Sequence, residues 1–128
     1  VGGLIGFFCR DAHVKTTITN NTVSGTLYGY QTIGGAIGSC SYNDHADGKL
    51  TEDRIVFTGT NDFSGVKIHR YAQTYKAVAL FASNGTDAKR IKNDGIIIYT
   101  EKDADGQDIE MFRNYSTTDG FGGTFQTK

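Results

Sequence analysis

Two stretches of the sequence decide the fold that we expect. The first reads Val14-Lys-Thr-Thr-Ile-Thr-Asn-Asn-Thr-Val-Ser-Gly-Thr-Leu-Tyr-Gly-Tyr30, and the second reads Arg54-Ile-Val-Phe-Thr-Gly-Thr-Asn-Asp-Phe-Ser-Gly-Val-Lys-Ile-His-Arg-Tyr71. In each, β-branched and aromatic residues flank a short polar segment, and Asn, Asp and Gly tolerate the positive φ that hairpin turns need. Both stretches therefore predict a strand, a tight turn and a second strand.

The same pattern occurs a third time. Residues 95–115 again combine two apolar segments with a polar turn between them. A further strand is expected before each pair, and these three strands cover residues 4–9, 36–40 and 77–82. Residues 122–126 resemble the start of a fourth round. A spacing of about 40 residues between later rounds indicates an internal repeat.

Three strands in each round, with one closing strand, predict roughly ten short strands. Residues 65–69 alternate apolar with polar side chains, which is typical of a strand with one buried face. We therefore expect a single all-β domain over residues 1–128, formed as a closed antiparallel β-barrel or sandwich with a three-fold internal repeat. A β-trefoil is the alternative, because it also contains three similar units.

Composition and charge argue against several classes of protein. The 128 residues suffice for one domain, and 13 basic side chains face 14 acidic ones, giving a net charge of −1. A protein that binds nucleic acid through phosphates usually has a basic stripe, whereas the longest basic cluster here is Lys89, Arg90 and Lys92. No apolar run approaches the ~20 residues that span a bilayer. We expect neither a nucleic-acid partner nor a membrane span.

Cysteine usage and glycosylation signals point to the extracellular space. Cys9 and Cys40 are the only cysteines, and without a Cys-x-x-Cys pair they predict one disulfide rather than a zinc site. Three triplets fit the N-glycosylation pattern, beginning at Asn20, Asn84 and Asn114. These features predict a secreted glycoprotein.

Residues 53–69, Asp-Arg-Ile-Val-Phe-Thr-Gly-Thr-Asn-Asp-Phe-Ser-Gly-Val-Lys-Ile-His, resemble the final catalytic hairpin of fungal guanyl-specific ribonucleases. The resemblance implies that Arg54 stabilises a phosphoryl transition state and that His69, on the paired strand, is the general acid. That family also needs a carboxylate base earlier in the sheet. The only upstream Glu is Glu52, and residues 34–36 contain no acidic side chain. We therefore expect no catalytic site.

Two other groups of residues could bind something. Residues 102–108 are rich in carboxylates but lack the distal bidentate Glu of a calcium loop, so we expect no metal or other cofactor. Several tyrosines follow the expected hairpins, and on an exposed face they would form a recognition surface. They are Tyr28, Tyr30, Tyr71, Tyr75 and Tyr115.

These observations favour a small secreted, non-catalytic binding protein. An effector or elicitor with a role in virulence, from a fungus or another microbe, fits them best, and its partner would be a host or cell-surface protein or glycan. Three alternatives stay open: a carrier that holds a small apolar ligand inside a β-barrel, a carbohydrate-binding lectin, and a guanyl-type ribonuclease-like protein. The sequence predicts no oligomeric state.

Overall fold

The computed structural model describes residues 1–6, 8–10, 16–29, 32–38, 40–42, 55–70, 77–82, 91–113 and 122–128. Within these ranges the chain forms strands, turns and bends and no helix, so no described helix could cross a membrane. The twelve strands are β1 (Phe8–Arg10), β2 (Thr16–Thr19), β3 (Thr22–Gly29), β4 (Thr32–Ile37), β5 (Cys40–Tyr42), β6 (Ile55–Thr58), β7 (Thr60–Arg70), β8 (Ala77–Ala82), β9 (Ile91–Asn93), β10 (Ile96–Tyr99), β11 (Glu110–Arg113) and β12 (Thr124–Thr127).

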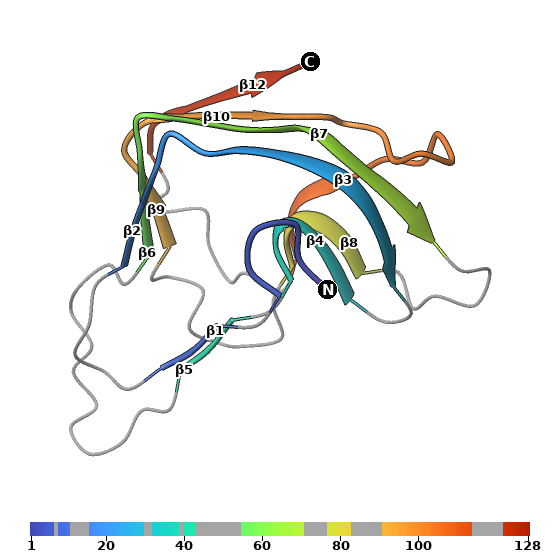
Figure 1. Ribbon diagram of the computed structural model, residues 1–128, viewed down its shortest axis with the longest axis horizontal. Coiled ribbons are helices and arrows are strands. Elements are labelled where there is room, and N and C mark those ends of the chain that lie inside the picture. Colours follow the sequence, from blue (N-terminus) through green and yellow to red (C-terminus); the bar gives the residue numbers. More distant parts are fainter. Residues whose placement is uncertain are drawn as a thin grey trace.

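The strands form three parallel sheets and one parallel pair. The sheets have the orders β2-β6-β9, β12-β10-β7-β3 and β11-β8-β4, and β1 pairs with β5. The chain passes from one sheet to the next and then returns to the first, so that each strand lies beside its counterpart from the next passage (Figure 1). The described strands therefore form a parallel β-solenoid.

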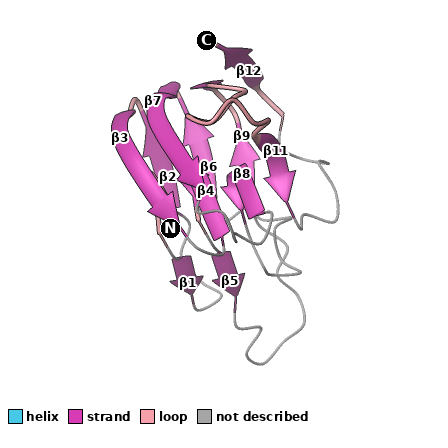
Figure 2. Ribbon diagram, turned by 90° about the vertical axis from the view of Figure 1, so that its right-hand side faces the viewer, coloured by secondary structure: helices cyan, strands magenta, loops and turns pink. Residues whose placement is uncertain are grey.

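We call one passage through the three sheets a coil. Coil 1 contains β2, β3 and β4, coil 2 contains β6, β7 and β8, and coil 3 contains β9, β10 and β11. β12 starts a fourth coil beside β10. Viewed from the side, β3 lies next to β7, and β4 lies next to β8 (Figure 2).

The predicted antiparallel barrel or sandwich is wrong, and so is the β-trefoil alternative. Every pair of described strands is parallel, and the two halves of each expected hairpin belong to different sheets. Of the expected turn residues, Asn20 has a positive φ of 53°, as predicted. Asn61 and Asp62, expected as the second turn, lie within β7 instead, and the positive φ of that corner, 62°, falls at Gly59. Both corners turn the chain into the next sheet instead of back along the same sheet. Alternation of apolar and polar residues did not reveal this, because parallel and antiparallel strands share the two-residue period.

The register explains the internal similarity. Thr16 lies opposite Ile55 and Tyr28 opposite His69, offsets of 39 and 41 residues that match the first two quoted stretches. The third stretch was aligned wrongly. Ile96 lies opposite Thr60, the first residue of β7, whereas the strand beside β6 is β9, which the sequence analysis did not identify.

The N-terminal residues add a further layer to one sheet. Gly2 lies opposite Gly34 and Ile5 opposite Ile37, both in parallel bridges. The Gly3 N–H donates to the Gly34 carbonyl oxygen at 3.0 Å. A Cβ atom on Gly2 would come within 1.8 Å of the Ile5 oxygen, and one on Gly34 equally close to the Ile37 oxygen, so the same tight backbone turn requires glycine in both layers.

The hydrophobic core lies between the sheets and contains a cluster of packed aromatic side chains. Phe57 is fully buried and contacts Phe63 and Phe81 edge to face, with ring centroids 6.3 and 5.5 Å apart. A cavity beside Phe63, between the sheets, has a volume of about 10 Å³. That volume holds at most one water molecule.

Candidate functional site

The candidate site is an exposed pair of rings on the outer face of the largest sheet. Tyr28 at the end of β3 lies opposite His69 in β7. Their rings are stacked, with centroids 5.1 Å apart and planes 11° apart. Tyr28 is 56 % exposed, and only it and Val1 are exposed large hydrophobic residues in the described part of the chain. The Tyr28 ring therefore lies against His69 on one side and stays largely exposed to solvent.

Strand alternation places His69 outward. Val66 and Ile68 are buried in the core, whereas Lys67 between them is exposed and His69 is partly exposed. Thr26 lies opposite Lys67 on β3 and is also exposed. Hydroxyl, ammonium and imidazole groups thus lie on the same face of the sheet as the Tyr28 ring. We call Thr26, Tyr28, Lys67 and His69 the Tyr28 platform.

A turn made by residues 101–109 holds a carboxylate beside the platform. The Asp105 Oδ1 atom lies 3.6 Å from His69 Nδ1. The Arg70 N–H donates to Asp105 Oδ2 at 3.3 Å, and the Ala104 N–H donates to the Ile68 carbonyl oxygen at 2.9 Å. These contacts attach the turn to the end of β7.

Asp103 is the residue that fixes this turn. Its carboxylate is fully buried, and its Oδ1 atom accepts hydrogen bonds from the N–H groups of Asp105 at 2.9 Å and Gln107 at 2.8 Å. Its other oxygen pairs with the Arg70 guanidinium, which also donates to the Asp108 carbonyl oxygen at 2.7 Å. The Asp103 carboxylate therefore accepts its hydrogen bonds from groups within the protein.

The same turn is the carboxylate-rich segment considered for calcium. Lys102 forms an ion pair with Asp108, and the hydrogen bond from Lys102 lowers the pKa of Asp108 below its usual range. Across the described ranges, no three His, Cys, Asp or Glu side chains are grouped as a metal site would require. Ion pairs and hydrogen bonds within the chain therefore account for the shape of this turn.

The two residues of the ribonuclease resemblance have different outcomes. Arg54 lies outside the described residues. His69 is described, but β6 and β7 belong to different sheets, so residues 53–69 do not form the hairpin that the resemblance implies. The neighbours of His69 are the Tyr28 ring and the Asp105 carboxylate.

Of the three glycosylation candidates, Asn84 and Asn114 lie outside the described residues. Asn20 is exposed at the corner between β2 and β3, and its Oδ1 atom accepts a hydrogen bond from the Thr60 N–H at 3.0 Å. A glycan is attached through Nδ2, so this hydrogen bond is compatible with glycosylation. Occupancy of Asn20 stays a prediction.

The two cysteines lie on the paired strands β1 and β5, at positions that are not directly opposite each other. Cys9 in β1 is opposite Ser41, and Cys40 in β5 is opposite Phe8. The backbone thus brings the two residues to adjacent positions with an offset of one. The disulfide stays a prediction.

Sequence analysis singled out Tyr28 and His69 for separate reasons and did not join them. The signal that could have joined them is the alignment of the first two stretches, which sets these residues about one repeat apart. The other tyrosines of the expected recognition surface, Tyr30, Tyr71, Tyr75 and Tyr115, lie outside the described residues.

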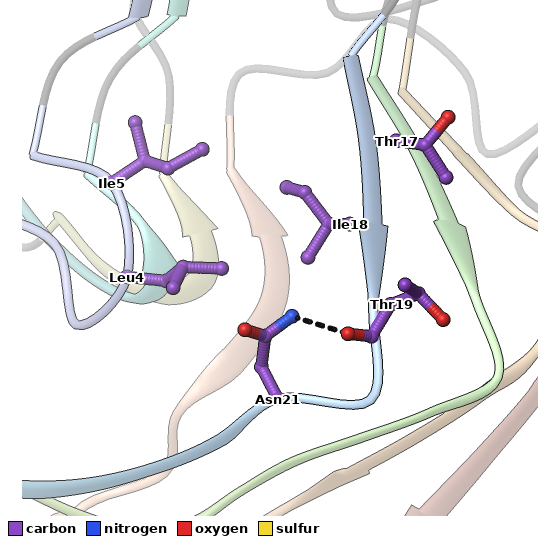
Figure 3. A pocket seen from close by; sticks show the side chains of 6 residues that line it. All are labelled: Leu4, Ile5, Thr17, Ile18, Thr19 and Asn21. Atoms are coloured by element: carbon purple, nitrogen blue, oxygen red, sulfur yellow. Dashed lines mark hydrogen bonds between the residues drawn. The ribbon is translucent and has the colours of Figure 1, made fainter.

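A second feature, which the sequence did not reveal, is a cavity at the N-terminal end of the solenoid (Figure 3). Its volume is about 350 Å³, and it is lined by Leu4, Ile5, Thr17, Ile18, Thr19 and Asn21. The lining comes from the N-terminal residues on one side and from β2 with the following corner on the other. The position of this cavity depends on the order in which the coils stack, and the periodicity of the sequence does not indicate that order.

Comparison with known proteins gave no match among protein-family models, curated proteins or solved structures. The functional argument therefore depends on the geometry of the chain itself.

Proposed function

We propose that this protein is an extracellular, non-catalytic binding protein that recognises a glycan through the Tyr28 platform. The observation that carries the proposal is the stacked and exposed pair of Tyr28 and His69. A large aromatic ring that is left in solvent and held rigidly by a neighbouring ring is a typical recognition element.

A glycan fits the chemistry of the platform. One face of a sugar ring carries mainly C–H groups, which can lie on the Tyr28 ring, while its hydroxyl groups need donors and acceptors at the rim. Lys67 and Thr26 supply donors, and Asp105 supplies an acceptor beside His69. The mixture of a cation and a carboxylate gives no basic patch for a phosphate backbone, which argues against nucleic acid.

The extracellular part of the proposal rests on the two cysteines and the three glycosylation triplets. An effector or elicitor that attaches to a host surface would need a stable scaffold and an exposed recognition face. We include that role in the proposal, with a cell-surface glycan as the partner.

The first test is binding of the purified protein to a glycan array, followed by titration of any ligand found. Tyr28→Ala should weaken binding at least about tenfold, because the stacking surface is lost. Tyr28→Phe, which keeps the ring, should bind nearly as the unchanged protein does. Thr17→Ala, an exposed change in another sheet, is the control. An empty array, or equal binding by Tyr28→Ala, would contradict the proposal.

The same preparation separates binding from catalysis. Incubation with RNA from pH 5 to pH 8 should give no cleavage above that of buffer. Cleavage that disappears in His69→Ala would favour the ribonuclease-like alternative and contradict the non-catalytic proposal.

A further inference from the structure

The Tyr28 platform continues as a strip along β3 and β7, which lie side by side (Figure 2). Alternate residues of a strand share a face, so the outward positions of the two strands follow one another in opposite pairs. These pairs are Tyr28 with His69, Thr26 with Lys67, and Ser24 with Gly65. From the first pair to the last, each strand spans about 13 Å. A ligand that stacks on the Tyr28 ring can therefore extend along the strip to the other two pairs.

The end of the strip away from the Tyr28 ring is open. Ser24 and Gly65 are both exposed, and Gly65 carries no side chain. A Cβ atom on Gly65 would lie 2.8 Å from the Ser24 Cβ atom, so this position requires glycine. At this step the two strands present no side chain larger than that of serine, and the backbone of Gly65 is accessible to a ligand.

Lys67 is the one lysine in the described part of the chain that forms no ion pair. The other described lysines are paired with aspartates, namely Lys92 with Asp94 at 3.2 Å, Lys128 with Asp62 at 3.4 Å, and Lys102 with Asp108. Lys67 is exposed, and Thr26 lies opposite it. Neighbouring strands are about 4.8 Å apart, so the ammonium group of Lys67 and the hydroxyl group of Thr26 can bind the same anion.

The carboxylate nearest to the platform faces a different side of β7. Asp105 lies 3.6 Å from His69, and it belongs to the turn that follows β10. In this sheet β10 and β3 lie on opposite sides of β7. The strip itself contains no carboxylate. A negative group placed between Thr26 and Lys67 therefore meets a cation and a hydroxyl donor, and it lies on the side of β7 away from Asp105.

We propose that the glycan bound by the Tyr28 platform is anionic, with a sugar ring on Tyr28 and its carboxylate or sulfate group at Lys67 and Thr26. This inference rests on the proposed function, because it names the class of glycan that the same site takes. A nucleic acid also combines flat rings with negative charge. Its binding normally involves several phosphates, each with its own cation, whereas this strip contains one lysine.

The test is a glycan array that carries matched pairs of ligands, followed by titration of those that bind. One set pairs uronic acid oligosaccharides with their methyl esters, and the other pairs sulfated oligosaccharides with their unsulfated forms, so the two sets distinguish the two sources of charge. The anionic member of at least one set should bind at least about threefold more tightly than its neutral partner. A single-stranded oligonucleotide is titrated beside them.

Variants of Lys67 assign the preference to this side chain. Lys67→Gln removes the charge, and it should abolish the preference for the anionic member while the neutral member binds as before. Lys67→Arg keeps the charge and should keep the preference. Lys92→Gln removes the same charge from another sheet and is the matched control. Circular dichroism shows whether each variant is folded.

Salt gives a second readout that needs no variant. Raising the ionic strength from about 0.1 M to about 1 M shortens the Debye length from about 10 Å to about 3 Å. Binding of the anionic member should weaken, and binding of the neutral member should not.

The outcomes separate this inference from the proposed function. Equal binding of both members of every pair, with Tyr28→Ala weakening both, would overturn the inference and leave glycan binding standing. An anionic preference that Lys67→Gln retains would overturn it in the same way. Absence of binding to every ligand would overturn both proposals, and so would an oligonucleotide that binds more tightly than any sugar.

Discussion

Asp62 shows how one side chain connects separate coils. Its Oδ1 atom accepts hydrogen bonds from the Ser64 N–H at 2.8 Å and the Ser64 hydroxyl at 2.6 Å, and Lys128 beyond β12 lies 3.4 Å from Oδ2. The hydrogen bonds from Ser64, with a smaller contribution from Lys128, hold the pKa of Asp62 below its usual range. Its charged form is therefore favoured in the folded state.

This lowered pKa predicts a dependence of stability on pH. Asp62 contributes stability above its unfolded pKa of about 3.9, and that contribution is lost as the pH falls through the lower folded pKa. Asp62→Asn should therefore unfold in less urea than the unchanged protein at pH 7, and the difference should shrink towards pH 3. Ser64→Ala should show part of the same effect. A difference that is constant from pH 7 to pH 3 would contradict this account.

At the level of single residues, the sequence predicted orientation better than contacts. Alternation along residues 65–69 correctly predicted that Val66 and Ile68 face the core. It could not predict that the outward His69 stacks on Tyr28, because that contact depends on the neighbouring strand. The buried carboxylate of Asp103 was also not foreseen, since nothing local distinguishes it from Asp105 and Asp108.

The turn at residues 101–109 is the element with the clearest single support. Asp103→Ala should lower the free energy of unfolding by about 3 kcal/mol, because it leaves Arg70 without its buried partner and frees two backbone N–H groups. Asp103→Asn keeps an oxygen acceptor and should cost less. Urea unfolding measures both changes.

Hydrogen exchange locates the effect. The amides of Asp105 and Gln107 should exchange faster in Asp103→Ala, whereas the amide of Asp94, in another corner, serves as the control. Equal stability and equal exchange in all three proteins would show that the turn is held by its other contacts.

For whole elements, sequence prediction succeeded where a strand is apolar throughout. Residues 77–82 were expected to form a strand, and β8 spans Ala77–Ala82. The corners misled the prediction, because Asn20 has the positive φ of a hairpin turn but leads from β2 into β3, which belongs to another sheet. The residues of a turn specify that the chain changes direction. Which sheet a strand joins depends on the strand with which it pairs, and that strand is distant in sequence.

For the molecule as a whole, Phe57 in coil 2 is the centre of the core. Phe57→Ala should lower the free energy of unfolding by about 3–5 kcal/mol, because a fully buried ring leaves a cavity that the sheets fill only partly. Phe57→Leu, closer in volume, should cost clearly less. Calorimetry should show one transition at a lower temperature, because coils 1 and 3 both pack on coil 2. Two separate transitions would mean that the coils unfold independently.

The overall architecture was only partly accessible from the sequence. All-β structure followed from the turn residues, the β-branched residues and the aromatic residues, and it is confirmed. Strand direction did not follow, because the repeat was interpreted as hairpins arranged around an axis and not as coils stacked along one. The length of the repeat decreases along the chain, and this made the stacked coils harder to recognise in the sequence. The offset between paired residues is 39 from Thr16 to Ile55, 36 from Ile55 to Ile91 and 28 from Ile96 to Thr124.

The parallel stacking of coils also determines how the chain must fold. Among the described strands, none pairs with its immediate neighbour in sequence, and the one local antiparallel bridge among the described residues, between Lys102 and Asp108, lies inside the turn at residues 101–109. Early local structure of the described chain therefore joins no two strands of a sheet. The first pairing between two described strands has to close a loop of 28 residues or more, and the entropy of that closure precedes any gain from burial. Folding should therefore wait for two adjacent coils to meet, after which each further coil has a template on which to form.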